Sequence, residues 1–202
     1  MANKFLEIAL TPSVLAAQTK YFGQPRPVPT AAARDPLGPD EMEFIRTRDS
    51  FYMATVMENG WPYVQHRGGL PGFLHIRDSH TLAFADYKGN RQLITTGNMA
   101  VDGRVAFFLM DYPRQLRLKI LGHGRVEDAR HHPELVIELA APPIHRIVER
   151  LVLIDVTSFD WNCSQYITPR YTTDEIEELT KPLKQRIEEL EAQLQARDVE
   201  RR

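Results

Sequence analysis

The chain has 202 residues, of which 43% are hydrophobic, so it is long enough for one domain with a sizeable core and appendages. Its formal net charge of -2 gives no large cationic field for binding nucleic acid, so the basic residues are expected to act locally. The single cysteine, Cys163, excludes an intramolecular disulfide framework and favours a buried structural thiol. These features, without a visible signal peptide or apolar run of about 18 residues, predict a cytoplasmic protein that does not enter a membrane.

The first 39 residues read as an arm. Thr11 is a candidate N-cap and Gly23 a candidate stop for one helix. A proline-rich connector, Gln24 to Pro39, follows and is expected to be extended. We expect residues 1–39 to pack along the central domain or a partner subunit; the alternative is a disordered tail.

Residues 40–171 read as the central domain, which opens with a helix and a β-hairpin. Asp40 is expected to cap a helix from Glu41 to Arg48. Two strand-like runs, Phe51–Val56 and Trp61–Arg67, then flank a tight turn that contains Gly60.

The second strand of this hairpin ends in polar residues followed by paired glycines. Gln65, His66 and Arg67 precede Gly68 and Gly69. Paired glycines allow the backbone to approach a flat ligand closely, and the polar side chains would line that approach. The alternative is an ordinary hairpin with a glycine-rich exit.

A basic turn follows the next strand-like run, Thr81–Ala85. It comprises Asp86, Tyr87, Lys88, Gly89, Asn90, Arg91 and Gln92, and it leads into a short helix-like run from Leu93 to Gly97. With Asn90 as N-cap, the helix start would offer free N–H groups to an anion, and Lys88 and Arg91 would add mobile charges. This arrangement predicts a phosphate site, and the alternative is a solvated loop.

The remainder of the central domain is predicted from local patterns. Leu121-Gly122-His123-Gly124 indicates a strand with a bulge rather than a cofactor loop. A helical insertion is expected from His132 to Ala141, and Leu151–Val156 reads as a buried closing strand.

Residues 172–202 read as a charged helical appendage. Thr172 and Glu175 form a candidate capping box, and Pro182 is expected to divide the helix, with Thr180 capping the second part. Apolar residues follow the 3.6-residue period of a straight helix, at Ile176, Leu179, Leu183, Ile187, Leu190 and Leu194. We expect this face to pack on a dimer surface, with docking of a protein partner as the alternative.

The sequence lacks the motifs of several other enzyme classes. The chain has no HExxH motif, no Gly-x-Ser-x-Gly elbow, no Walker loop and no GxGxxG motif. A hydrolase or a metalloenzyme is therefore unsupported, and no metal site is expected.

Taken together, the order of these segments resembles the pyridoxamine 5'-phosphate oxidase-like family of FMN-binding split barrels. The resemblance covers roughly residues 40–171. The segments that carry it are 51–56, 61–73, 82–98, 105–111, 116–126 and 160–171. It implies a mainly β fold, a β-barrel with flanking helices, and a homodimer that holds FMN at the subunit interface.

The resemblance also implies site residues at matching positions. The strand end Gln65, His66, Arg67 and Gly68 would contact the flavin and its phosphate. The turn residues Asp86, Tyr87, Lys88, Asn90, Arg91 and Gln92 would hold the phosphate. Arg117, with Lys119 as second choice, would reach the flavin of the partner subunit. Trp161, Gln165 and Arg170 in the tail would complete the pocket.

The resemblance predicts an FMN-dependent oxidoreductase that acts on a small organic substrate. The segment 162–169 departs from the pattern of the vitamin B6 oxidases, which points to a different substrate. No catalytic residue is assigned. The alternative is a non-catalytic FMN carrier or redox sensor whose C-terminal helix docks a partner.

Overall fold

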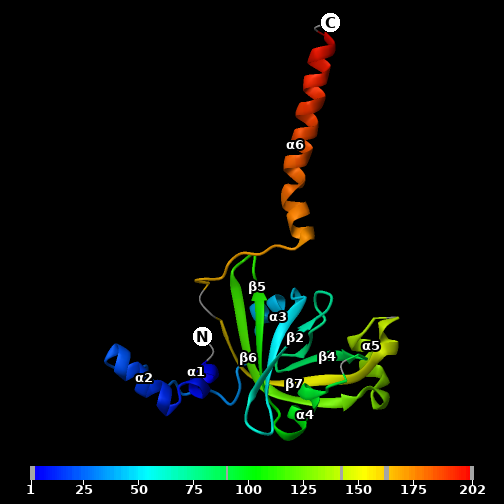
Figure 1. The fold of residues 1–202 in the computed structure, drawn as a ribbon. Helices are drawn as coiled ribbons and strands as arrows, with labels where there is room; N and C mark the ends of the chain where they lie inside the picture. The colour runs from blue at the N-terminus through cyan, green and yellow to red at the C-terminus, as the bar shows by residue number, and fades with distance from the viewer. Residues whose placement is uncertain (1–2, 90, 142, 162–163, 201–202) are drawn as a thin grey trace.

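The computed structural model describes residues 3–89, 91–141, 143–161 and 164–200, with side chains described up to Arg197 (Figure 1). One antiparallel sheet dominates it. The seven strands follow the order β2-β1-β5-β6-β7-β4-β3. They are β1 (Ser50–Val56), β2 (Pro62–Gly68), β3 (His75–Asp78), β4 (Thr81–Tyr87), β5 (Arg104–Asp111), β6 (Leu116–Asp128) and β7 (Val148–Trp161). The sheet curls into a split barrel with flanking helices, which confirms the predicted mainly β fold (Figure 1).

The β1–β2 hairpin forms as the sequence predicts. The N–H of Met57 donates to the carbonyl of Trp61 at 2.9 Å, and Gly60 turns the chain with φ of 85°. A positive φ is nearly free of steric cost for glycine alone, so Gly60 fixes where the strand reverses. The register then places Arg67 opposite Phe51.

Strand β4 is buried on both faces, because two apolar layers sandwich it. Leu82 and Phe84 belong to the core inside the barrel. Ala83 and Ala85 face a second cluster formed with the helix α5 (Pro133–Leu139). Small residues on the outer face let α5 approach the sheet closely.

The glycine-containing stretch of β6 is a bulge, as predicted. The register between β6 and β7 shifts between Leu121 and Gly122. A Cβ on Gly122 would lie 2.6 Å from the backbone oxygen of Asp155, so the two strands meet too closely there for any side chain. The predicted helix 132–141 is also confirmed, as α5, and the predicted closing strand lies within β7.

The helix α3 (Pro39–Arg46) begins earlier than predicted. Its N-cap is Gly38 rather than Asp40, and Pro39 occupies the first helical position, where a missing N–H is harmless. The Gly38 N–H donates to Glu41 Oε2 at 2.9 Å, which completes the cap. Asp40 therefore lies inside the first turn.

The N-terminal arm contains two helices, one more than predicted. The predicted helix is α2 (Pro12–Phe22), with Thr11 at its N-cap and Gly23 at its C-cap. The additional helix is α1 (Asn3–Ala9). The end of the arm contacts the barrel, because the Asp35 N–H donates to the carbonyl of Thr157 on β7 at 3.0 Å, whereas α2 has no buried residue.

The helix α6 (Thr173–Glu200) is continuous, so the predicted division at Pro182 is wrong. The capping box is present, since Thr172 N–H donates to Glu175 Oε2 at 2.7 Å and Glu175 N–H to Thr172 Oγ1 at 3.2 Å. Thr180 caps nothing; its hydroxyl donates to the carbonyl of Ile176 at 2.8 Å within the helix. Pro182 removes one N–H donor from the helix, and the helical turns before and after it remain continuous. Figure 1 shows α6 projecting away from the barrel.

The close approach at Gly122 yields a stability prediction. Gly122→Ala should lower the free energy of unfolding by about 1–3 kcal/mol, because the new methyl group must push β6 and β7 apart. Chemical denaturation measures this. The matched control is Gly97→Ala, in the helix α4 (Ile94–Val101), where a Cβ meets nothing within 4 Å. Equal stability of Gly122→Ala and the parent would contradict the packing described for the bulge.

Candidate functional site

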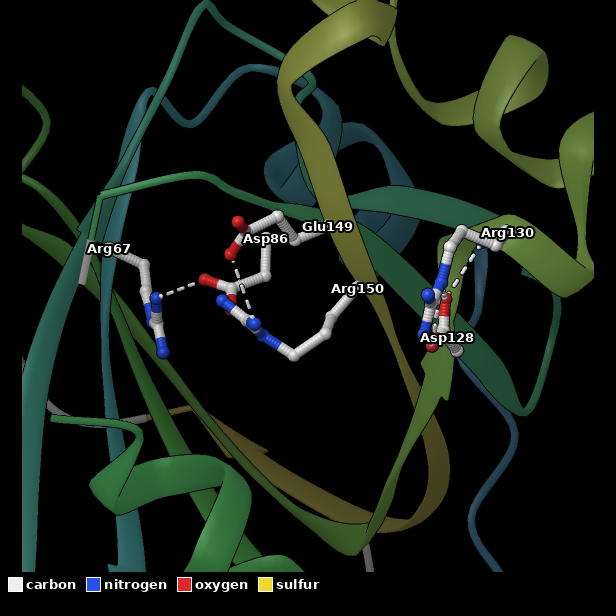
Figure 2. Close-up of polar contacts among 6 residues, drawn as sticks. All are labelled: Arg67, Asp86, Asp128, Arg130, Glu149 and Arg150. Atoms are coloured by element: carbon white, nitrogen blue, oxygen red, sulfur yellow. Dashed lines mark hydrogen bonds and ion pairs between the residues drawn. The ribbon is translucent and has the colours of Figure 1, made fainter. Parts of the chain in front are cut away.

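The carboxylate of Asp86, near the end of β4, binds two arginines from different strands. Arg67 Nη1 on β2 donates to Asp86 Oδ1 at 2.8 Å, and Arg150 Nε on β7 donates to Asp86 Oδ2 at 2.8 Å. Asp86 and Arg150 are direct partners in the β4–β7 ladder, whereas Arg67 reaches Asp86 from the edge strand at the other end of the sheet. Figure 2 shows the carboxylate between the two guanidinium groups.

The three charges are largely buried. Asp86 is 8% exposed, and the side chains of Arg67 and Arg150 are 15% and 16% exposed. Burial lowers the pKa of Arg150, but hydrogen bonds and the charges of Asp86 and Glu149 outweigh it and raise the pKa above its usual value. Arg150 therefore stays cationic. Arg67 Nε and Arg150 Nη2 are buried without a hydrogen-bond acceptor, so the site has unmet donor capacity.

A cavity of about 430 Å³ lies beside Arg150. Its lining comprises Lys88, Gly89, Arg91, Leu93, Glu149 and Arg150. Glu149 Oε2 pairs with Arg150 Nη1 at 3.1 Å. Among the described residues, Lys88 and Arg91 form no ion pair, and the Glu149 carboxylate in the lining is paired with Arg150.

A second hollow shares Glu149 and Arg150 with this cavity. It measures about 520 Å³, and Asp128 and Arg130 contribute to its wall. Arg130 Nη2 is 2.6 Å from Asp128 Oδ2, and the hydrogen-bonded guanidinium lowers the pKa of that carboxyl. The Arg130 side chain in this pair is 84% exposed, whereas the group around Asp86 is largely buried. Figure 2 draws both groups.

The helix after the basic turn starts later than predicted. α4 begins at Ile94, and its N-cap is Leu93 with φ of 53°, so the prediction that Asn90 caps this helix is wrong. Asn90 itself lies outside the described residues. Leu93 adopts a left-handed conformation, which is uncommon for residues other than glycine. The turn is anchored instead through Lys88, whose N–H donates to the carbonyl of Ile147 at 2.7 Å.

Strand alternation separates the polar residues of β2. Gln65 and Arg67 share one face, where Gln65 Oε1 accepts a hydrogen bond from Thr95 Oγ1 of α4 at 2.9 Å. His66 is exposed on the opposite face, with its ring 5.5 Å from that of Tyr52. The structure therefore brings Gln65 and Arg67 toward α4 and Asp86, and leaves His66 on the outer surface.

Gly69, one of the paired glycines that follow, packs against an aromatic side chain of the protein itself. A Cβ on Gly69 would lie 2.6 Å from the Phe73 ring, which stacks on Phe51 with ring centroids 5.3 Å apart. The flat group beside Gly69 is thus Phe73. Gly68 forms the last pair of the β1–β2 ladder, opposite Ser50.

Two other residues of the predicted turn, Tyr87 and Gln92, differ in their surroundings. Tyr87 packs against the cluster beneath α5, and burial raises its pKa. It does not line the cavity beside Arg150. Gln92 is exposed.

The predicted residues of the later strands lie elsewhere. Trp161 is at the opposite end of β7 from Arg150, and its indole N–H donates to Glu41 Oε1 of α3 at 2.6 Å. Gln165 is exposed, and the guanidinium of Arg170 lies 5.0 Å from the ring centre of Tyr112. Arg117, at the start of β6, keeps a buried Nε without an acceptor. Lys119 pairs with Asp160 at 2.8 Å.

Sequence reasoning missed Glu149 and Arg150. They stand directly before the apolar run that predicted β7, so their place at a strand start was visible. Their proximity to Asp86 was not, because it depends on antiparallel pairing across 64 positions.

The described residues contain no group of three or more His, Cys, Asp or Glu side chains that could hold a metal ion. None of the helices in the described part of the chain is long and apolar enough to span a membrane.

This geometry belongs to a split barrel with a cation-lined cavity at the β4–α4 turn. Residues 38–156 match the family model of pyridoxamine 5'-phosphate oxidase, which covers more than half of the chain. The chain therefore belongs to the pyridoxamine 5'-phosphate oxidase family, as the resemblance indicated. No curated protein matches the sequence.

Solved structures with similar folds include three from different bacteria. HupZ of Group A Streptococcus is 15% identical, with 67% of this chain and 100% of that chain covered and a TM-score of 0.47. A protein related to general stress protein 26 from Clostridium acetobutylicum is 12% identical over 68% and 94% of the two chains, with a TM-score of 0.48. An FMN-binding protein from Syntrophomonas wolfei is 12% identical over 60% and 86%, with a TM-score of 0.43.

The ion pairs of Asp86 yield a second stability prediction. Asp86→Asn should destabilise the fold by roughly 3–5 kcal/mol, because it leaves the buried guanidinium of Arg67 without a counterion and leaves Arg150 with Glu149 alone. Thermal and chemical denaturation measure this. Asp128→Asn is the matched control: it removes the same charge from the exposed pair with Arg130, and its denaturation midpoint should barely move. Similar small effects of both substitutions would show that Asp86 does not hold the barrel together.

Proposed function

We propose that this protein binds FMN, with its phosphate in the cavity beside Arg150, and uses it to oxidise or reduce a small organic substrate. The observation that carries the proposal is the cation set of this cavity. Lys88, Arg91 and Arg150 line it, and the first two have no ion-pair partner among the described residues. A phosphate dianion supplies the acceptors that these donors lack.

The residues present fit such a group. Arg67 Nε and Arg150 Nη2 lack acceptors, and a small turn of Arg150, which already lines the cavity, would bring its free N–H toward a phosphate oxygen. Gly89 has φ of 149°, and a Cβ there would meet nothing within 4 Å, so the backbone of the turn is open to a ligand. Glu149 is the one unfavourable charge in the lining.

The protein's own groups would bind and orient the cofactor. Lys88, Arg91 and Arg150 would hold the phosphate, while Asp86 keeps Arg67 and Arg150 in place. When bound, the flavin ring supplies the electron-transfer chemistry, and the protein controls its position and surroundings.

We further propose a homodimer in which FMN lies between two subunits. The predicted residues of the later strands and tail lie away from the cavity within one chain; they are Arg117, Trp161, Gln165 and Arg170. A flavin that contacts both these residues and the cavity residues would therefore contact two copies of the chain. The outer face of the β1–β2 hairpin supports this, because it exposes apolar side chains: Tyr52 is 41% and Val64 is 60% exposed. Trp161 is engaged by Glu41, which favours a substrate other than a vitamin B6 phosphate.

The phosphate site is tested by the double substitution Lys88→Ala and Arg91→Ala. It removes two charge-assisted bonds of roughly 1.5–3 kcal/mol each, so FMN affinity should fall at least about a hundredfold. Riboflavin affinity should barely change, because riboflavin has no phosphate. Fluorescence titration of each flavin measures both constants.

Two companion variants sharpen this test. Lys181→Ala with Lys184→Ala removes the same charge from exposed positions on α6 and should leave FMN affinity unchanged. Glu149→Gln removes the repelling carboxylate and should tighten FMN binding. Parental FMN affinity in the Lys88/Arg91 variant would refute the site, and an equal loss of riboflavin binding would indicate damage to the fold.

The second candidate function is an FMN carrier or redox sensor, favoured by the exposed apolar face of α6. A measurement of steady-state turnover distinguishes an FMN carrier or sensor from an oxidoreductase. With FMN bound, an oxidoreductase should show sustained oxidation of a reduced nicotinamide in the presence of oxygen or a small organic acceptor. A flavin that is reduced once without turnover would support the carrier.

A further inference from the structure

Helix α6 contains two consecutive copies of an 11-residue pattern. Residues 176–186 read IEELTKPLKQR, and residues 187–197 read IEELEAQLQAR. Both copies start with Ile-Glu-Glu-Leu, carry leucine at the eighth position and end in arginine. Pro182 interrupts the first copy but not the helix.

The repeat produces a straight apolar stripe. Eleven residues in three turns give about 3.67 residues per turn, close to the 3.6 of an α-helix, so equivalent positions stay on one side. The stripe contains Ile176, Leu179, Leu183, Ile187, Leu190 and Leu194, and these side chains are 42–65% exposed. It runs for about 27 Å, at about 1.5 Å per residue.

This stripe requires a partner. Most helices in proteins are stabilised by packing of an apolar face, and a solitary helix in water is only marginally stable. Figure 1 shows α6 standing clear of the barrel. A repeating row of large aliphatic side chains is typical of helices that pair along their length.

The charges beside the stripe indicate which partner fits. With about 100° of rotation per residue, Arg186 and Arg197 border one side of the stripe and Glu191 borders the other. In a parallel pair of identical helices, each side faces the opposite side of the partner, so Arg186 meets the partner's Glu191. In an antiparallel pair, each side would face the same side of the partner, so Arg186 would not meet the partner's Glu191.

We propose that α6 pairs with α6 of a second copy of this chain, parallel and in register. Arg186 Nη1 now contacts Glu189 Oε2 at 2.8 Å, but both side chains are about 60% exposed, so this bond is easily exchanged. Parallel pairing places both barrels at the same end of the helix pair. An antiparallel pair would hold them apart by about the length of the 28-residue helix, roughly 42 Å. The proposal does not depend on flavin binding.

Cysteine cross-linking of the full chain tests the pairing. In a Cys163→Ser background, Leu183→Cys and Leu194→Cys should each give disulfide-linked dimers under mild oxidation at micromolar concentration. Both positions lie on the stripe and would face their own copies within the roughly 7 Å between Cα atoms that a disulfide allows. Gln185→Cys, exposed on the opposite face, is the matched control and should stay monomeric on a non-reducing gel.

The charge pattern is tested in the Leu194→Cys background. Arg186→Glu should slow cross-linking by about fivefold, and adding Glu191→Arg should restore it, because two exposed pairs are lost and then re-formed. Lys181→Glu makes the same charge change away from the stripe and should have no effect. The proposal is overturned if Leu183→Cys and Leu194→Cys remain monomeric, or if Gln185→Cys cross-links equally. It is also overturned if cross-linked dimers form only when the Ile176→Cys and Leu194→Cys proteins are mixed, because residues at opposite ends of the stripe meet only in an antiparallel pair.

Discussion

The bond between Asp86 and its two arginines is the constraint on which the barrel depends. The sheet is a single ordered row of strands, and curvature alone does not join its two ends. Arg67 comes from the edge strand β2, and Asp86 from β4 near the other edge, so their ion pair closes the split. Arg150 donates a hydrogen bond to the same carboxylate and also lines the cavity. The ion pair that closes the barrel therefore also positions one wall of the candidate site.

Features set by short-range chemistry were predictable from the sequence. The turn at Gly60 and the capping box at Thr172 depend on residues that are neighbours in the chain, and the structure contains both. The glycines of β6 also predicted the bulge at Gly122, although Asp155, which packs against it, belongs to a later strand. The family resemblance extended this reading to the barrel and the basic turn. The position of Arg150 could not be reached in this way, because one sequence does not reveal which strands pair.

Two differences between the prediction and the structure have specific physical causes. Gln65, His66 and Arg67 were predicted to line one approach, and the structure places His66 on the opposite face of β2 because neighbouring residues of a strand point to opposite faces. The helix was predicted to divide at Pro182 because proline disfavours helix interiors, but the apolar period continues across that residue, and so does the helix.

The double burial of β4 has a consequence for motion. The strand is bonded to β7 along its length on one edge and to β3 on the other, and apolar layers cover both of its faces. Strands that are paired on both edges and buried on both faces are usually the last to open, so we expect the amide protons of β4 to exchange slowly with solvent. Asp86 lies near the end of this strand, whereas Lys88 and Arg91 lie beyond it on an exposed turn. The site thus combines a carboxylate on a buried strand with cations on an exposed turn, and only Tyr87 separates Asp86 from Lys88.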